Sequence, residues 1–585
     1  MSERREPGIP ARSGAAPDLV VRGATVVDGS GAPPFTADVA VRDGRVTDVG
    51  RVDEHGAEEL DADGAVLAPG FVDIHTHYDA QLQWEPTASP SSWHGVTTVI
   101  TGNCGFSLFP ARPDDLPWLL LMLSRVEGMP PDTLAAGATF AGGGCADFAA
   151  NLEAGGLGVN VGLQVGHSAV RRYVLGDAAV ERAATAAEIT EMTALVGDAV
   201  GEGAVGFTSS QLDLHVTHDG HPVPSNLASP DELVALAGAL AEFPDGALEF
   251  ISRTNLEGHS DADRSLMLAM CAASGKPMNV NPVQPLPNQP DGWRATIEFA
   301  EAAERAGARV YPQSATQQLQ VFFALADTFL FDEMPAFRDT LTLPAGEREQ
   351  RLFDANLRDK MRAQWADTSN RHIVFGWDNI KVARADHHPD WVGLRVPELR
   401  DRLGVPDELE AFLDASLAED LQLVFTLAGS GGAGGRRSPA NPATATIVAH
   451  PLTLPGSSDA GAHLSSYCGV DYTTRLLTEY VPDALPLEQA VARLTAVPAA
   501  IYGLADRGIV RPGAAADLVL WDPARLASGA TRWVEDFPAG GGRFVVDAEG
   551  YLALVVNGAV VRHDGVDTGA RAGRVVRRSG TARRA

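Results

Sequence analysis

The middle of this 585-residue chain alternates between short apolar runs and amphipathic segments, and this alternation restricts its fold more than any other feature. Runs rich in Val, Ile and Phe predict buried strands at residues 95–100, 158–165, 204–207, 247–251, 278–280, 308–311 and 373–375. Helical patterns lie between them at residues 184–200, 230–241, 261–273 and 294–306. Repeated strand–helix units favour a parallel sheet, and this number of units favours a (β/α)8 barrel.

Both ends of the chain are rich in strand patterns instead. Asp43-Gly44 separates two strand-like runs and predicts a hairpin turn, and similar runs return at residues 516–522 and 552–561. We therefore predict an α/β protein. Its parts are a polar, disordered tail at residues 1–17, a barrel over 68–504 with an insertion near 322–366, and a β-sandwich from 18–67 plus 505–585.

The composition excludes several classes of partner. The net charge is 46 − 76 = −30, which argues against binding to nucleic acid or to an anionic membrane. The N-terminal residues lack the apolar core of a signal peptide, and no stretch offers the ~20 apolar residues of a membrane span. The four cysteines are scattered, which is typical of a reducing compartment. We predict a cytoplasmic protein that could form a homo-oligomer.

Polar residues that follow the predicted strands are the candidates for chemistry, because active sites of such barrels lie at the carboxyl ends of strands. One apolar run ends in His75 and His77, which point to the same side if the strand continues. Cys104 follows the next strand in a glycine-flanked turn, and Asp459 follows a late strand. Imidazole, thiolate and carboxylate are all zinc ligands. Structural histidines, a buried small cysteine and an aspartate turn before Gly461 are the alternatives.

Three motifs resemble the amidohydrolase superfamily, and specifically its D-aminoacylase (N-acyl-D-amino-acid deacylase) branch. They are Gly70-Phe-Val-Asp-Ile-His-Thr-His77, Gly102-Asn-Cys-Gly105 and Ser458-Asp-Ala-Gly-Ala-His463. The resemblance implies that His75, His77, Cys104 and Asp459 bind metal. It also implies that Asp459 is the general base for the attacking water.

Other histidines are weaker candidates. His215 lies close enough to a strand end to complete the metal shell, whereas His218 and His221 stand beside Asp-Gly and fit a solvated turn. The Gly-His-Ser motif at His167 resembles a pocket histidine of the family, although a core histidine fits equally well. His450 and His463 flank Asp459 and are candidates for contacts behind the ligands.

Two positions depart from the family. Where the resemblance calls for Ser-His pairs that hold the tightly bound metal, this chain has Ser252-Arg253 and Asn281-Pro282. Two metal-binding histidines are therefore missing, and we predict one divalent ion, Zn²⁺ before others, rather than two. Arg253 becomes a candidate for polarising the scissile carbonyl or for binding a substrate carboxylate. Ser252 and Asn281 are expected to lie beside the substrate.

Together these features predict a metal-dependent hydrolase of a C–N amide bond in a small molecule, with an N-acyl D-amino acid as the first choice. A cyclic amide, as opened by the hydantoinases and dihydropyrimidinases of the same superfamily, is the alternative. A barrel that has lost catalysis and only binds a small molecule or partner is a second alternative, motivated by the missing histidines.

Overall fold

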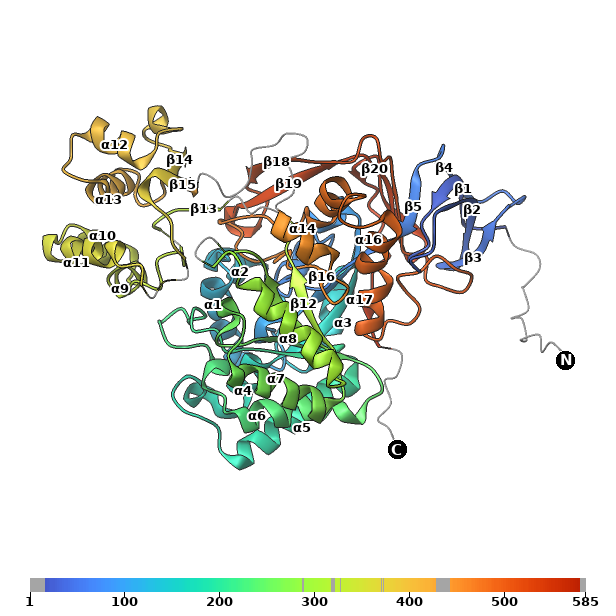
Figure 1. Ribbon diagram of the computed structural model, residues 1–585, viewed down its shortest axis with the longest axis horizontal. Helices are drawn as coiled ribbons and strands as arrows, with labels where there is room; N and C mark the ends of the chain where they lie inside the picture. Colours follow the sequence, from blue (N-terminus) through green and yellow to red (C-terminus); the bar gives the residue numbers. More distant parts are fainter. Residues whose placement is uncertain are drawn as a thin grey trace.

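The computed structural model describes residues 16–286, 289–316, 321–326, 328–369, 371, 373–427 and 442–578. Residues 1–15 of the predicted disordered tail lie outside these ranges. Figure 1 shows a central barrel, a sheet at one side in which the blue N-terminal strands approach the red β20, and a yellow helical lobe.

Among the described residues, eight parallel strands form the barrel, and strands that are neighbours in the sheet are also successive barrel strands along the chain. They are β6 (Phe71–Asp73), β7 (Val96–Thr101), β8 (Asn160–Gly166), β9 (Gly206–Ser210), β10 (Ala247–Ile251), β11 (Met278–Val283), β12 (Val310–Ser314) and β16 (Leu454–Pro455). A parallel bridge between Thr76 and Ala460 joins the chain beyond the first strand to the chain beyond the last. The predicted (β/α)8 barrel is confirmed.

Helices connect the barrel strands, and the four predicted ones correspond to α5–α8. The helices of this part are α1 (Leu116–Val126), α2 (Pro131–Gly137), α3 (Cys145–Gly155), α4 (His167–Leu175), α5 (Ala186–Glu202), α6 (Pro230–Gly238), α7 (Asp261–Ser274), α8 (Trp293–Arg305), α14 (Pro442–Ala449), α15 (Tyr472–Arg475), α16 (Leu487–Leu494) and α17 (Ala496–Ile501). Thr185, Ser229 and Ser260 begin α5, α6 and α7, because each hydroxyl accepts a backbone N–H of the first turn. None of the described helices is long and apolar enough to cross a membrane.

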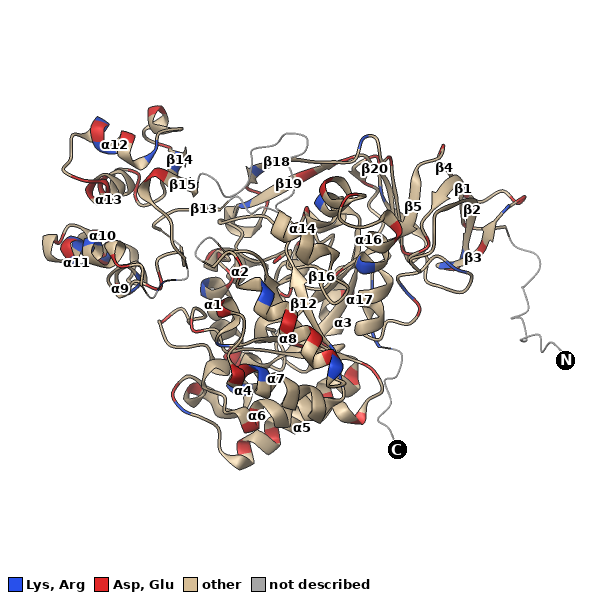
Figure 2. Cartoon of the chain, in the orientation of Figure 1, with Lys and Arg blue, Asp and Glu red and all other residues tan. Residues whose placement is uncertain are grey.

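A lobe with its own hydrophobic core is inserted between β12 and β16. It continues beyond residue 366, its predicted end, to Leu427. Its elements are β13 (Phe322–Phe323), α9 (Pro335–Leu341), α10 (Ala345–Leu352), α11 (Ala355–Ala366), β14 (Ile380–Arg384), α12 (Val396–Leu403), α13 (Glu408–Ala418) and β15 (Val424–Leu427). Acidic and basic side chains are mixed on its helices (Figure 2), and pairs such as Arg362–Glu410 join them.

The predicted strand at residues 373–375 is wrong. No strand forms there, and Ile373 and Phe375 pack against the core of the inserted lobe instead. The eighth place in the barrel belongs to β16. A short apolar run shows that a segment is buried, but it does not show which of two cores buries it.

The sequence predicts a β-sandwich built from both chain ends, and the structure joins strands of both ends in one sheet. They are β1 (Leu19–Val26), β2 (Phe35–Arg42), β3 (Arg45–Gly50), β4 (Glu58–Asp61), β5 (Val66–Pro69), β17 (Leu518–Trp521), β20 (Tyr551–Val556), β21 (Ala559–His563) and β22 (Val566–Asp567). The two ends meet where β5 pairs with β17. Asp43 and Gly44 both have positive φ, which is the backbone of the predicted hairpin turn. A separate ribbon pairs β18 (Ala527–Val534) with β19 (Arg543–Glu549), and β23 (Val575–Val576) extends the barrel sheet beside β8.

A buried ion pair fastens the sheet to the barrel. Asp517, beside β17, forms a short ion pair with Arg507 and accepts a hydrogen bond of 3.0 Å from Asn160 of β8. Its other carboxylate oxygen accepts the backbone N–H of Asn557 at 2.7 Å. Both charged side chains are almost completely buried, so Asp517 compensates most of the Arg507 charge, and the partly exposed Asp506 lies 3.4 Å from the same guanidinium.

We expect Asp517→Ala to lower the free energy of unfolding by about 3–5 kcal/mol, because it removes the buried partner of Arg507 and leaves this buried guanidinium with the partly exposed Asp506 at 3.4 Å. Urea denaturation followed by fluorescence measures the change. The matched control is Asp53→Ala, which removes an exposed pair with Arg51 and should change stability by less than about 1 kcal/mol. Equal effects of the two substitutions would contradict this account of the interface.

Candidate metal centre and active site

His75 and His77 follow β6 and lie on the same side of an extended segment. Thr76, between them, turns away and donates both its N–H and its hydroxyl to the carbonyl of Ile100. The N–H of His77 donates to the carbonyl of Ala460 at 2.7 Å, so the segment is held between the first and last strands of the barrel. The two imidazole rings lie 5.2 Å apart and are buried.

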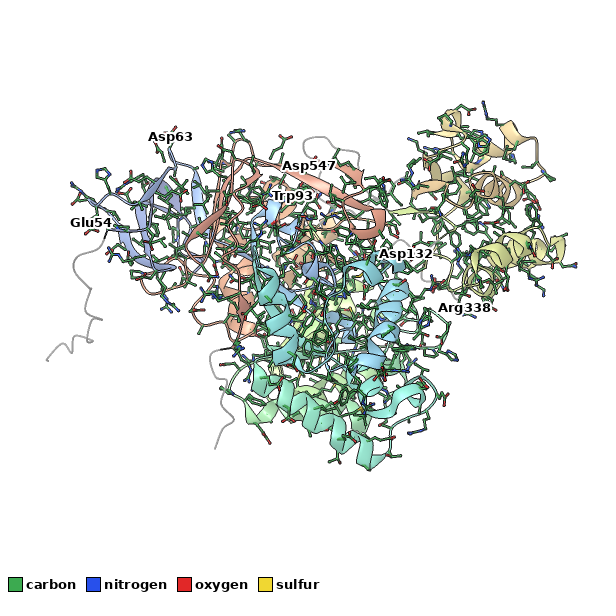
Figure 3. All side chains as sticks on the ribbon, turned by 180° about the vertical axis from the view of Figure 1, so that it is seen from behind. Glu54, Asp63, Trp93, Asp132, Arg338 and Asp547 are labelled. Atoms are coloured by element: carbon green, nitrogen blue, oxygen red, sulfur yellow. The ribbon has the colours of Figure 1, made fainter. Side chains whose placement is uncertain are left out.

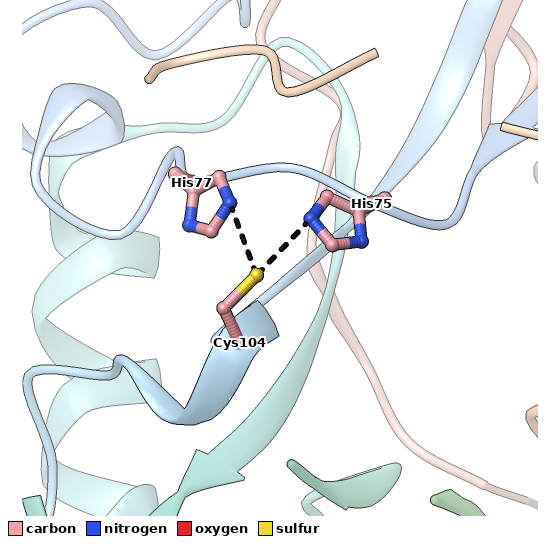
Figure 4. Close-up of side chains that lie close together, drawn as sticks. All are labelled: His75, His77 and Cys104. Atoms are coloured by element: carbon pink, nitrogen blue, oxygen red, sulfur yellow. Dashed lines mark hydrogen bonds between the residues drawn. The ribbon is translucent and has the colours of Figure 1, made fainter. Parts of the chain in front are cut away.

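Cys104 lies in a tight turn directly after β7. Its own φ is +56°, and Gly102 before it and Gly105 after it both have φ of +81°. A Cβ on Gly102 would collide with the carbonyl oxygen of Gln164, so only glycine fits there. The turn points the Cys104 sulfur at the histidines, 3.4 Å from His75 Nε2 and 3.9 Å from His77 Nε2 (Figure 4).

Asp459 follows β16, the last barrel strand, and its side chain reaches the same place. Its φ is +50°, and the preceding Ser458 donates its hydroxyl to Asp73 at 2.7 Å. Asp459 Oδ1 lies 3.2 Å from His75 Nε2 and 3.8 Å from His77 Nε2. Its side chain is 25% exposed while both histidines are buried, so Asp459 is the member of the group that solvent and substrate can reach.

These separations fit a metal ion. In a tetrahedral site with ordinary zinc bond lengths, neighbouring ligand atoms lie about 3.3–3.6 Å apart. The donor atoms of His75, His77 and Cys104 all lie within 4.8 Å of one another, and Asp459 Oδ1 lies at 3.2–3.8 Å from the two histidines. The residues therefore suit a zinc-type ion bound by two imidazoles, a thiolate and a carboxylate.

Two buried carboxylates beside this group were not predicted from the sequence. Glu127, directly after α1, places Oε1 3.3 Å from His77 Nδ1. Glu249, inside the barrel on β10, accepts the backbone N–H of Cys104 at 2.8 Å. Burial raises the pKa of Glu249 to about 7, and burial together with Asp459 raises the pKa of Glu127 well above its usual range. The only sequence signal for Glu249 is a charged residue at an inward-facing position of a buried strand.

A cation would stabilise the charged forms of the acidic groups in this region. Within the described part of the chain, no hydrogen bond or ion pair joins Cys104, Glu127, Glu249 or Asp459 to a lysine or arginine. Burial, and then Glu249, raises the pKa of the Cys104 thiol well above its usual range. A divalent ion supplies the missing positive charge and holds such a thiol as the thiolate.

Tyr467 fixes the orientation of the Asp459 carboxylate. The buried phenol donates to Asp459 Oδ2 at 2.6 Å, which leaves Oδ1 toward the histidines. Burial and the neighbouring Asp459 raise the pKa of Tyr467, so the phenol keeps its proton. Burial alone would raise the pKa of Asp459, but the hydrogen bond from His75 and the charges of the nearby histidines outweigh it, and the pKa of Asp459 lies well below its usual range.

We call His75, His77, Cys104 and Asp459 the donor group. The structure also places three further candidates relative to it. Asn281 Nδ2 is 3.2 Å from His75 Nε2. His463 lies 4.0 Å from Glu127 and packs against Phe329 of the inserted lobe, with ring centroids 4.9 Å apart. His215 bonds Ser210 at 2.9 Å and is not one of the residues that the donor group brings together.

The structure places four other candidates in contacts away from the donor group. Arg253, predicted to face the substrate, is 43% exposed and forms an ion pair with Asp213. A long side chain at the rim can reach several carboxylates, and the acidic loop after β9 offers one. His167 is hydrogen-bonded to Ser209 and Glu232. Ser252 is hydrogen-bonded to His259, and His450 to Glu301 on α8.

A hollow elsewhere on the molecule is a separate feature. A cleft of about 300 Å³ lies between the barrel and the sheet, and Figure 3 labels Trp93 and Asp547 of its lining close together. None of the residues that line it belongs to the donor group.

Sequence comparison decides the family. Residues 58–562 match the amidohydrolase family. The chain belongs to the amidohydrolase family. Among curated members, N-acyl-D-aspartate deacylase of Alcaligenes xylosoxydans xylosoxydans is 30% identical over 96% of this chain and 95% of its own length. D-aminoacylase of the same organism is 28% identical over 96% of this chain and 98% of its own length.

Solved amidohydrolase structures agree with the fold. N-acyl-D-glutamate deacylase of Bordetella bronchiseptica, in complex with zinc and a phosphonate inhibitor, superimposes with a TM-score of 0.65 at 26% identity and covers 96% of this chain and 100% of its own. A D-aminoacylase described as having a binuclear metal centre gives a TM-score of 0.67 at 26% identity with the same coverage.

The Ser252–His259 pair predicts a loss of stability in acid. His259 is buried, and burial lowers its pKa from 6.5 to about 4. The unfolded chain binds a proton there below pH 6.5 but the folded chain does so only below pH 4, so this contribution is lost as the pH falls between these values. It amounts to about 3 kcal/mol by pH 4.

In His259→Asn, we expect the free energy of unfolding to fall less steeply between pH 6.5 and pH 4 than in the wild type. Asparagine tolerates the positive φ of this position. Urea denaturation at a series of pH values measures both slopes. His55→Asn, at a side chain that is 90% exposed, should leave the slope unchanged. Parallel curves for wild type and His259→Asn would show that His259 does not carry this dependence.

Proposed function

We propose that this amidohydrolase cleaves the amide bond of N-acyl amino acids and releases a carboxylic acid and a free amino acid. The observation that carries the proposal is the convergence of His75, His77, Cys104 and Asp459 at the carboxyl ends of barrel strands. The relatives named as D-aspartate deacylase and D-aminoacylase support D-amino acids as the first substrates to test.

One divalent ion, with zinc as the first choice, would be held by the two histidines, Cys104 and Asp459. When bound, such an ion lowers the pKa of water toward ~7 and polarises carbonyl groups. The zinc complex of the D-glutamate deacylase supports the choice of metal. The preference for a single ion rests on Arg253 and Pro282, which occupy the positions where the predicted family pattern has histidines and which supply no imidazole.

Glu127 would position His77 in this centre. Its Oε1 lies within ion-pair distance of Nδ1, at 3.3 Å, and no hydrogen bond forms there in the structure. A ring proton on Nδ1, shared with Glu127, would leave Nε2 to bind the metal beside Cys104. Cys104 must stay reduced to act as a ligand. Within the described residues the four cysteines form no disulfide, which supports the prediction of a reducing, cytoplasmic location.

Asp459 would move the proton. It is ionised because its pKa is low, it is partly exposed, and its orientation is fixed by Tyr467. Asp459 takes a proton from the water whose oxygen forms the new bond to the amide carbon. It then gives this proton to the amide nitrogen as the C–N bond breaks, so the base is restored.

We expect metal-reconstituted protein to hydrolyse N-acyl-D-amino acids faster than the L-isomers, hydantoin or dihydrouracil in a ninhydrin or chromatographic assay. Asp459→Asn should lower kcat on the order of 10²–10⁴-fold, because it removes the general base and weakens a ligand. Asp390→Asn, in an exposed pair with Arg402 on the inserted lobe, is the control and should leave kcat unchanged. Preferential opening of hydantoin, or full activity in Asp459→Asn, would overturn the proposal.

A further inference from the structure

The proposed reaction needs a group that stabilises the carbonyl oxygen of the substrate, and Arg253 does not face the donor group. Its guanidinium bonds Asp213 and the carbonyl of Asn226. Asn281 is an uncharged hydrogen-bond donor beside the metal ligands. It is buried on β11, and its Nδ2 lies 3.2 Å from His75 Nε2.

The backbone explains why Asn281 points there. The pairing of β11 with β12 is irregular between Val280 and Val283, and Pro282 in this interval has no N–H to donate. Such irregularities redirect a side chain relative to a regular strand. Asn255 Nδ2 donates to the backbone carbonyl of Asn281 at 2.7 Å and fixes the bend.

The neighbouring hydroxyl decides which end of the Asn281 amide faces the ligands. Ser457 makes a short hydrogen bond to Asn281 Oδ1 and lies 3.2 Å from Gln313 Oε1. Its single proton serves one of these oxygens, and the buried Nε2 of Gln313 has no partner. With the Gln313 amide turned over, Nε2 donates to Ser457 and Ser457 donates to Asn281 Oδ1. The Asn281 NH₂ group then faces His75.

A histidine that uses Nε2 as a ligand offers Asn281 neither a proton nor a lone pair. The N–H donors of Asn281 are then available to a group that binds beside His75, whose Nε2 also lies 3.2 Å from Oδ1 of the partly exposed Asp459. An amide does not ionise between about pH 4 and pH 10, so Asn281 adds no charge to the acidic groups around it.

We propose that Asn281 is a catalytic residue that donates a hydrogen bond from Nδ2 to the oxygen of the scissile carbonyl. As water attacks the carbon, the C=O electron pair moves onto this oxygen, and the bond to Asn281 strengthens. When the C–N bond breaks, the pair returns and the carbonyl re-forms. This role rests on the proposed function and replaces the one predicted for Arg253. Loss of one such donor costs on the order of 10²–10³-fold in kcat.

Two variants test this role in the metal-reconstituted protein. Asn281→Leu has a similar shape without a donor, and Asn281→Asp keeps the acceptor oxygen without the NH₂. We expect both to lower kcat by about 10²–10³-fold, to change KM by less than about threefold and to keep the metal content of the wild type. Arg253→Gln should have a smaller effect on kcat than either.

A second readout does not depend on turnover. Calorimetry measures the affinity for a phosphonate analogue of an N-acetyl-D-amino acid, which places a negatively charged oxygen where the substrate oxygen would be. Both Asn281 variants should bind it about 10²-fold or more weakly than wild type, in parallel with the loss of kcat. If wild type hydrolyses no N-acyl amino acid, the proposed function fails, and the phosphonate affinities still decide the role of Asn281.

Three outcomes would overturn the inference. Unchanged kcat and unchanged phosphonate affinity in both variants would exclude Asn281 as the donor. Loss of metal in Asn281→Leu would make Asn281 a ligand instead. A large loss of kcat in Arg253→Gln, with little loss in the Asn281 variants, would show that Arg253 stabilises the carbonyl oxygen, as the sequence predicts.

Discussion

The candidate site depends on one backbone junction, where the chain after the first barrel strand pairs with the chain after the last. The Thr76–Ala460 bridge and the bond from His77 N–H to Ala460 place Asp459 against the two histidines. Ser458 strengthens the junction, because its hydroxyl contacts Asp73 of β6 and the carbonyl of His75. Residues almost 400 positions apart in the sequence therefore become neighbours only when the barrel closes.

Closure gathers acidic groups in a place where, among the described residues, no lysine or arginine pairs with them. Glu127, Glu249, Cys104 and Asp459 surround the histidines, and burial opposes the charged form of each acid. A barrel used only for packing would gain nothing from this arrangement, because buried unpaired acids cost free energy. A bound dication would reverse the balance and would make the same residues ligands and supporting contacts. The acidic groups of the site and the distances between its donor atoms thus both favour a bound divalent ion.

Local pattern and barrel topology together predict which side chains converge. His75, His77, Cys104 and Asp459 each follow a strand, and the carboxyl ends of parallel strands converge. Local pattern does not predict which partner a long side chain bonds, or which of two hydrophobic cores buries an apolar run. Arg253 follows a strand too, but its length lets it reach Asp213 at the rim. Residues 373–375 are apolar, but they belong to the core of the inserted lobe. Glu127 follows a helix rather than a strand, so no pattern marks it as a partner of His77.

The central claim is that this amidohydrolase holds one metal ion among His75, His77, Cys104 and Asp459. The most direct test is the number of zinc ions per chain, measured by mass spectrometry of the elements after incubation with excess zinc and removal of the loosely bound metal. The account predicts one ion per chain. Two tightly held ions would contradict it and would show that other residues, with Glu249 and His215 first among them, replace the missing histidines.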